Sequence, residues 1–283
     1  MRIQQINNGL ESNTYNKMKS KKKFKKKHFR LKFILVFILF STVIVLLALS
    51  PLCTIKQITV SGGQHYKQED VVAVSGIVVG NNGFKTIGSN LNSIFSLRYG
   101  NSEKSILKNL PYVKNVVVKY AVPDKVRIIL TERKPICVVP YLGTNLLMDE
   151  EGYIIDTVNQ GAGNYNLPLV KGLKFEHFEL GQPLKVDNSE NLQAVITTFG
   201  AITDSDKSDK MKIFGLIKWI DVSDLKKICL FVDSRITVNI GDMQDLSYRI
   251  SFLKQIYSKN LKPDDKGLLD FTTGENPDFV PEN

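Results

Sequence analysis

Cysteine and histidine are scarce in this sequence of 283 residues, with three of each. Three cysteines are an odd number, so the sequence predicts no disulfide framework, and Cys137 and Cys229 are expected to be small buried hydrophobic residues. The histidines have none of the i, i+4 partners or cysteine pairs that a metal site uses. We therefore expect no metal site and no cofactor. The three histidines are His28, His65 and His177.

Motifs for catalysis are also lacking. Gly161-Ala162-Gly163 is not followed by a capped helix, so it does not predict a phosphate-binding loop. Asp204-Ser205-Asp206, with Asp209, resembles part of a calcium loop but lacks the glycine and terminal glutamate of that motif, and we expect a solvated loop. With no visible arrangement of nucleophile and base, the sequence predicts no enzyme. An acidic cluster flanks a turn, where acids are expected for backbone reasons: Asp149, Glu150, Glu151 and Asp156.

Positive charge is present in excess, but only at the N-terminus. Residues 1–32 hold eleven of the 38 lysines and arginines against one acid, Glu11, which leaves 27 basic and 27 acidic residues for the rest of the chain. The run KSKKKFKKKHFR at 19–30 has an alternative reading as a nucleic-acid or nuclear-localisation patch. Because the run lies directly before an apolar segment, we predict a cytoplasmic tail over 1–32 and no nucleic-acid partner.

The apolar segment from Phe33 to Ile55 contains no charged residue in 23 positions. About 20 apolar helical residues cross a bilayer, and the adjoining lysines and arginines favour retention of that end in the cytoplasm. A cleaved signal peptide is the alternative, since Ala48-Leu49-Ser50 resembles a cleavage site, but Pro51 would follow the cut. Lipoprotein processing at Cys53 would require a smaller residue than Leu52. We predict an uncleaved transmembrane helix over 33–53, with the C-terminal domain outside the cytoplasm.

A short mixed module is predicted after the span. Ile55–Val60 has the pattern of a strand, and Gln68–Val74 that of a short helix with Gly76 at its C-cap. The stretch 80–100 is rich in Gly, Asn and Ser and is expected to be a loop with one short amphipathic turn. Ser102 is expected to cap a second helix, which Pro111 ends. The apolar residues of the amphipathic turn are Leu91, Ile94 and Phe95.

A hairpin is predicted within residues 111–135, PYVKNVVVKYAVPDKVRIILTERKP. Apolar residues alternate before and after the turn at Pro123-Asp124, so each strand has one apolar face. The order strand, helix, helix, strand, strand implies a small sheet with two helices on one face. The residues of the apolar face are Val116, Val118, Tyr120 and Val122, then Val126, Ile128 and Leu130.

This ordered set resembles the FtsQ/DivIB family of bacterial cell-division proteins. The motifs that carry the resemblance are the basic tail, one span, ITVSG, LKNLPYVKNVVVKY, VPDKVRIILTERKP and LLMDEEGYIID. The segment from ITVSG to TERKP is similar to a POTRA domain. The likeness covers nearly all of residues 33–275, and one departure is a long insert at Phe84–Tyr99. The resemblance implies that the C-terminal domain continues the sheet of this POTRA-like module.

The remainder is predicted to be a β-rich domain with two helices packed on its sheet. Strands are expected around 146–148, 153–155, 216–222, 227–232, 236–240 and 266–272, and helices at 188–199 and 246–257. The predicted fold class is α+β. We divide the chain into the basic cytoplasmic tail at 1–32, the transmembrane helix at 33–53, the POTRA-like domain at 54–135, the C-terminal β domain at 136–275 and an extended tail at 276–283.

The resemblance implies a bitopic scaffold of the division machinery at the septum, linking early and late division proteins. The implied partners are small bitopic coiled-coil division proteins, FtsB/DivIC-like and FtsL-like. The alternative is an extracytoplasmic enzyme or sensor that uses the POTRA-like module for docking only. The resemblance also implies that these partners bind this end of the domain by strand addition. The last strand of the chain carries few of the charges and prolines that normally protect an edge, so we expect it to be the edge that pairs. The alternative is that this strand is an interior or covered element. That candidate site is Leu268, Leu269, Asp270, Phe271 and Thr272.

Overall fold

The computed structural model describes residues 31–88, 91–159, 166–274 and 276–282. The chain divides into two compact units, which we describe separately. The first comprises Met1–Thr59, Val78–Tyr99 and Lys119–Arg127, and the second comprises Val60–Ile77, Gly100–Val118 and Ile128–Asn283. The expected basic tail at 1–32 lies almost wholly outside the described residues.

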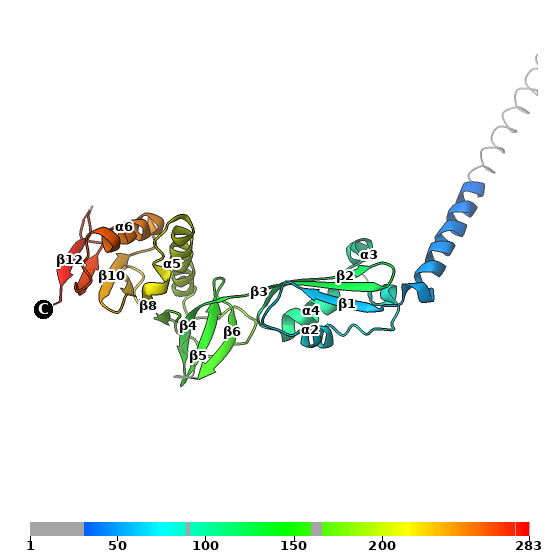
Figure 1. Cartoon of the computed structure of the whole chain (residues 1–283), viewed down its shortest axis with the longest axis horizontal. Helices are drawn as coiled ribbons and strands as arrows, with labels where there is room; N and C mark the ends of the chain where they lie inside the picture. The colour runs from blue at the N-terminus through cyan, green and yellow to red at the C-terminus, as the bar shows by residue number, and fades with distance from the viewer. Residues whose placement is uncertain (1–30, 89–90, 160–165, 275, 283) are drawn as a thin grey trace, which may run out of the picture. The chain divides into compact units, whose positions relative to one another are not determined.

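In the first unit, one helix covers Leu31–Ala48, and it is the one helix of the described chain that is long and apolar enough to cross a membrane (Figure 1). The described part of the helix includes Leu31 and Lys32, before the expected start at Phe33, and the helix ends before the expected boundary at Cys53. A 3-10 turn, η1 (Pro51–Cys53), follows it, with Pro51 as the first residue. Proline lacks the amide that a continuing helix needs, which accounts for the early end.

The smaller sheet has three strands in the order β1-β3-β2. The chain order strand, helix, helix, strand, strand is confirmed, with the short helices η2 and α3 inserted in the region expected to be a loop. Within the second unit, α2 and α4 pack on each other, and the Ser105 hydroxyl donates to the Val74 carbonyl at 2.8 Å. The elements are β1 (Gln57–Ser61), α2 (Gln68–Ser75), η2 (Gly83–Thr86), α3 (Leu91–Ser96), α4 (Gly100–Asn109), β2 (Val113–Ala121) and β3 (Lys125–Glu132).

The predicted register of the hairpin is confirmed. Val118 and Ile128 are fully buried, and the alternate residues of both strands are exposed or half-buried. Val122 is the exception, because it lies in the turn between the strands, beyond the end of β2, and is 54% exposed. The expected cap at Ser102 is wrong, since α4 begins two residues earlier, at Gly100, and Ser102 is buried within the helix.

The larger sheet has nine strands in the order β12-β11-β10-β9-β8-β7-β4-β5-β6. It is separate from the smaller sheet, so the expected continuation of the POTRA-like sheet is wrong. The reason is that both edges of β4 are occupied, by β5 and β7. The strands are β4 (Pro135–Tyr141), β5 (Thr144–Asp149), β6 (Ile154–Asn159), β7 (Leu169–Lys171), β8 (Ile217–Asp221), β9 (Ile228–Val232), β10 (Ile236–Gly241), β11 (Gly267–Asp270) and β12 (Asp278–Pro281).

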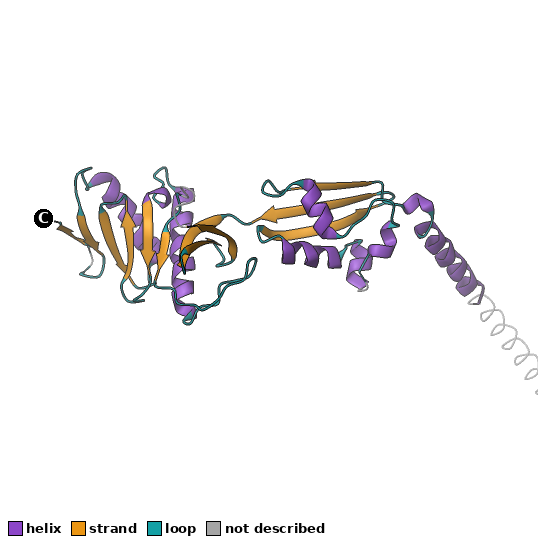
Figure 2. Cartoon of the chain, turned by 90° about the horizontal axis from the view of Figure 1, so that it is seen from below, coloured by secondary structure: helices purple, strands orange, loops and turns teal. Residues whose placement is uncertain are grey.

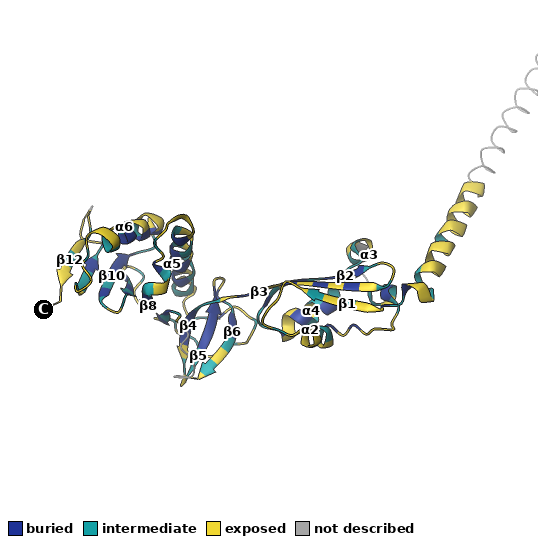
Figure 3. Cartoon of the chain, in the orientation of Figure 1, coloured by how far each residue is buried: buried dark blue, intermediate teal, exposed yellow. Residues whose placement is uncertain are grey.

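Two helices, α5 (Ser189–Ser208) and α6 (Leu246–Lys259), pack on one face of this sheet, as predicted (Figure 2). Their apolar stripes, which include Phe199 and Ile250, enter one continuous core with the facing strand residues. Figure 3 shows the buried residues of these helices and strands in dark blue. The helices therefore leave the opposite face of β8–β12 uncovered by any described helix.

Candidate partner-binding edge of the C-terminal sheet

The strand expected to be last in the chain, β11, is an interior strand. It pairs in parallel with β10 on one side and antiparallel with β12 on the other. β12 forms from residues expected to be an extended tail. The expectation that β11 is the open edge is therefore wrong, because a further strand of four residues follows it in the sequence.

The side chains of the expected site lie on two different faces. Leu269 and Phe271 are 1% and 8% exposed in the core, and the Phe271 ring contacts that of Phe252 on α6. They cannot supply specificity to a partner while the domain is folded. Leu268 and Asp270 alternate with them and are half-buried, and Thr272 is exposed just beyond the strand.

The approach of β12 to β11 depends on a glycine. Gly267 has a φ of +153°, and a Cβ built on it would lie 2.2 Å from the Val280 carbonyl oxygen. Any larger residue would push β12 away from β11. The pairing then runs through four registered positions, from Gly267 opposite Pro281 to Asp270 opposite Asp278.

The free edge of the sheet is consequently the outer side of β12. The Glu282 amide donates to the Lys266 carbonyl at 2.9 Å, so the alternation of an antiparallel pair directs the Val280 amide inward and the Phe279 amide outward. The neighbouring outward positions, 277 and 281, are prolines and have no amide to offer. The edge therefore presents one N–H, that of Phe279, together with carbonyl groups.

The turn after β11 is tied to the neighbouring strand by Asp270. Its carboxylate accepts from the Thr272 amide at 2.8 Å, the Thr272 hydroxyl at 2.6 Å and the Asn239 side chain at 3.1 Å. Burial opposes ionisation of this group, but the hydrogen bonds from Thr272 and Asn239 outweigh it and lower the pKa of Asp270. The carboxylate is thus a structural acceptor at the end of β11.

An apolar row crosses the uncovered face of the sheet and ends at β12. Each member stands opposite the next in the strand registers. Trp219 and Phe231 stack with ring centroids 5.3 Å apart, and Val280 is 56% exposed. A hollow of about 620 Å³ lies over the β12 end of this row. The row is Leu169, Trp219, Phe231, Thr237, Leu268 and Val280.

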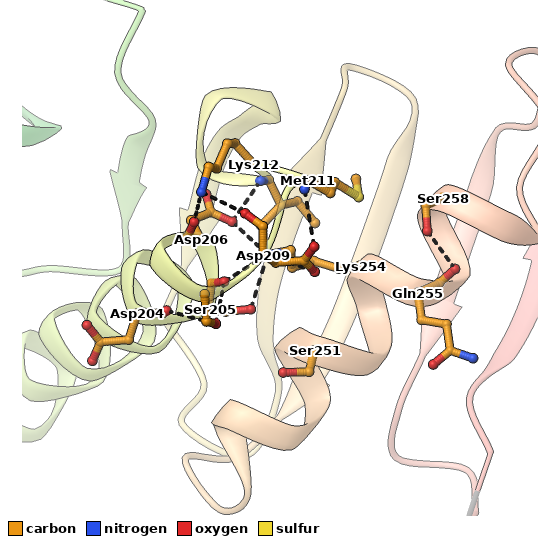
Figure 4. A network of polar contacts seen from close by, with 12 residues as sticks. Asp204, Ser205, Asp206, Asp209, Met211, Lys212, Ser251, Lys254, Gln255 and Ser258 are labelled. Atoms are coloured by element: carbon orange, nitrogen blue, oxygen red, sulfur yellow. Dashed lines mark hydrogen bonds and ion pairs between the residues drawn. The ribbon is translucent and has the colours of Figure 1, made fainter.

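On the covered face, a buried ion pair joins the two helices (Figure 4). The Lys254 ammonium on α6 lies 3.0 Å from the Asp206 carboxylate on α5 and also donates to the Ser205 carbonyl. Asp206 further accepts from the amides of Ile213 and Phe214. The expected solvated loop at 204–206 is wrong, since these residues end a helix, and Asp206 and Lys254 hold one another in place.

The acidic turn has a second ionic role that the sequence did not reveal. Asp149 accepts from the amides of Glu151 and Tyr153, which confirms the expected backbone role. It also pairs with the Arg133 guanidinium at 2.5 Å, and Asp149 is only 1% exposed. Lys114, with Arg133, lowers the pKa of Glu151. These contacts all lie within the second unit, where they join the end of β3 to the β5–β6 turn.

Among the remaining candidates for chemistry, some pack against neighbouring residues and others lie outside the described residues. The expected burial of Cys229 is wrong: it is half-buried, because its side chain lies on the same face of β9 as Phe231, which no described helix covers. No group of three metal-ligating side chains occurs in the described chain. His65 stacks on the Tyr112 ring with centroids 3.6 Å apart. Burial raises the pKa of the Cys137 thiol, which is then protonated and inert at neutral pH. His28 and Gly161-Ala162-Gly163 lie outside the described residues.

Comparisons with known proteins agree with this architecture. Residues 53–133 match the family model of the POTRA domain, FtsQ-type. The chain is 23% identical over 242 residues to the cell division protein DivIB of Clostridium tetani, covering 85% of this chain and 84% of that protein. It is 24% identical over 229 residues to DivIB of Clostridium acetobutylicum, with 80% and 82% covered. It is 25% identical over 116 residues to the cell division protein FtsQ of Koribacter versatilis, with 41% and 30% covered.

The matches and the fold together define the class of protein: along the chain, a POTRA domain of the FtsQ type follows an apolar helix and precedes a β-rich domain. Over most of its length the chain is then similar to DivIB cell-division proteins, and over a shorter part to an FtsQ protein, so the resemblance to the FtsQ/DivIB family is confirmed. The feature that the sequence reasoning missed is β12. Its local signals were the β-prone pair Phe279-Val280 and the prolines at 277 and 281, because proline in a strand is confined to edges.

Proposed function

We propose that this protein is a bitopic membrane scaffold of the bacterial division machinery, and that the outer edge of β12 takes up a strand from a small coiled-coil division partner, FtsB/DivIC-like or FtsL-like. Similarity to DivIB proteins over most of the chain supports the division role. The observation that carries the docking part is that β12 ends the nine-stranded sheet, with no described strand beyond it.

The chemistry of this edge suits strand addition from a specific partner. Main-chain pairing supplies affinity, and side chains on the same face supply specificity. A partner strand paired with the outward amide and carbonyl of Phe279 would extend the apolar row beyond Val280. The flanking prolines limit pairing to a short segment, which disfavours unspecific growth of the sheet.

Partner capture can be tested with two substitutions at one position. Phe279→Ala and Phe279→Pro both remove a partly buried ring, but only the proline removes the outward amide. We expect Phe279→Pro to bind the partner ectodomain roughly fivefold more weakly than Phe279→Ala, which is the effect of one hydrogen bond of about 1 kcal/mol. Equal binding by the two variants, with circular dichroism showing both folded, would contradict docking at this edge.

The division role itself is tested by depletion of the protein in cells. We expect cells to elongate into filaments without septa, and a fluorescent fusion to concentrate at the septum. Normal division after depletion would contradict the scaffold proposal whatever β12 binds.

The proposed orientation places the N-terminus in the cytoplasm and the C-terminal domain outside. In a background without Cys53, Cys137 and Cys229, an impermeant thiol reagent should label a cysteine introduced at Asn159, which is exposed at the end of β6. It should not label a cysteine introduced at Ser12. Equal or reversed labelling would contradict the orientation.

A further inference from the structure

The first unit carries exposed apolar side chains beyond its apolar helix. Those on α3 are the most prominent, with Phe95 86% and Ile94 47% exposed. Val78 and Val79 are more than half exposed on the segment that leads to η2, and Leu52 is 69% exposed on η1. Phe95 and Ile94 belong to the segment 84–99, which we expect to be an insert in the family pattern.

Hydrogen bonds hold these side chains close to the point where the apolar helix ends. The Asn82 side chain donates to the Ala48 carbonyl at 2.9 Å, and the Gly80 amide donates to the Ile55 carbonyl at 2.8 Å. Because Gly80 and Asn82 are bonded to residues at or just after the end of the apolar helix, the adjacent Val78 and Val79 are also held near that end. All of these groups lie in the first unit.

The insert is tied to the same place through Tyr120. Its hydroxyl donates to the Cys53 carbonyl at 3.0 Å, and its amide donates to the Leu97 carbonyl at 2.8 Å. The Arg98 amide in turn donates to the Ser93 carbonyl, which closes the end of α3. α3 is thus held by β2 at the end of the sheet that adjoins the apolar helix, as Figure 1 shows.

The charge of this unit differs from that of the rest of the chain. Past Ala48, it holds six basic residues and one acid, Asp124, whereas all the other residues after the helix hold 21 basic and 26 acidic side chains. Five of the six basic residues are exposed, and Lys85 lines a hollow of about 510 Å³ beside the helix end. The six are Lys56, Lys85, Arg98, Lys119, Lys125 and Arg127.

We propose that the first unit lies on the bilayer surface, with Phe95, Ile94, Val78 and Val79 at the level of the acyl chains and the surrounding lysines on anionic lipid headgroups. The combination of exposed apolar side chains and basic residues is the one that binds peripheral segments to anionic membranes. This inference rests on the proposal that Leu31–Ala48 spans the membrane, since the span would place α3 beside the lipid. The insert would then be a second membrane contact that limits tilting of the POTRA domain.

The test uses tryptophan fluorescence in the full chain, whose single native tryptophan, Trp219, is first replaced by phenylalanine. Three variants then carry one tryptophan each, Phe95→Trp, Leu39→Trp within the apolar helix and Leu142→Trp, which is 90% exposed in the β4–β5 turn. Each is reconstituted at high dilution in vesicles of phosphatidylglycerol and acyl-brominated phosphatidylcholine. Circular dichroism confirms that each variant is folded.

We expect bromine to quench Phe95→Trp several-fold more strongly than Leu142→Trp. Quenching of Leu39→Trp without quenching of Phe95→Trp overturns the surface proposal and leaves the span intact. Failure to quench Leu39→Trp overturns the span itself. A blue shift of Phe95→Trp that depends on the protein-to-lipid ratio and not on bromine would mean that a second copy covers the patch, which also overturns the proposal.

Matched charge changes test the basic residues. Lys85→Glu with Lys125→Glu, in the Phe95→Trp variant, should lower its quenching, and the quenching that remains should respond less to salt. Lys226→Glu with Lys227→Glu makes the same change of charge in the second unit and should leave quenching unchanged. Equal effects of the two pairs would mean that net charge alone, and not this surface, controls the contact.

Discussion

Two edge strands of this protein, β2 and β12, differ in whether their outward backbone amides have hydrogen-bond partners within the chain. On β2 the Val118 amide donates to the Glu103 carboxylate at 2.9 Å, and the Tyr120 amide donates to the Leu97 carbonyl. Arg98 also forms a bridge with Lys119. The outward amides of Val118 and Tyr120 on β2 are therefore occupied by its own chain.

The edge of β12 has no such internal partner among the described residues, and its guards are the prolines at 277 and 281. The comparison shows two ways to protect an edge strand from pairing with other chains. Its outward amides can be bonded within the chain, or prolines can remove those amides. Occupation closes the edge to every strand. Removal of donors leaves a short pairing segment free, which is the arrangement a specific partner can use.

The largest expected effect concerns the register of β2, which decides which of its side chains are buried. Val118→Asp would bury an unpaired carboxylate and should cost several kcal/mol of the free energy of unfolding. Lys119→Asp, on the exposed face of the same strand, should change it little. Thermal unfolding of the two variants measures the difference, and identical melting would mean that the strand is shifted by one residue.

An intermediate effect is expected when the guard of β2 is removed. Glu103→Ala leaves the Val118 amide without its acceptor and should lower the free energy of unfolding by about 1–2 kcal/mol in urea unfolding. Glu103→Gln keeps an acceptor oxygen and should retain most of the stability.

At the other edge, Pro281→Ala adds one outward amide to β12 and should raise self-association with little change in stability. If sedimentation showed Glu103→Ala alone to associate, the contrast between the edges would be wrong.

The smallest expected effect lies in the pH dependence at the end of β11. The pKa of Asp270 is lower in the folded state than its ordinary value of 3.8, so its carboxylate stabilises the fold above about pH 4 and this contribution is lost as the pH falls through the folded pKa. Asp270→Asn should therefore be slightly less stable at neutral pH and show a shallower loss of stability in acid. Parallel acid-unfolding curves for the two proteins would contradict this role.

Helices and strands were predicted correctly where a pattern of residues close together in the sequence was enough to identify them. The hairpin, α2 with its C-cap at Gly76, α6 and most C-terminal strands follow from alternation or from helical spacing. The open edge was expected on β11, but β12 covers β11 and ends the sheet. The ionic contacts of Asp206 and Arg133 could not be predicted, because their partners are separated by 16 residues or more in the sequence.

The sequence by itself determined the apolar helix, the POTRA topology and the register of the β2–β3 hairpin, since each depends on residues close together in the chain. Only the tertiary structure decided which strand ends the large sheet. β12 has four residues and few local signals, and it becomes a strand because β11 offers a row of unpaired groups and Gly267 admits its backbone. The Phe279 amide points outward only because β12 pairs with β11 in this register.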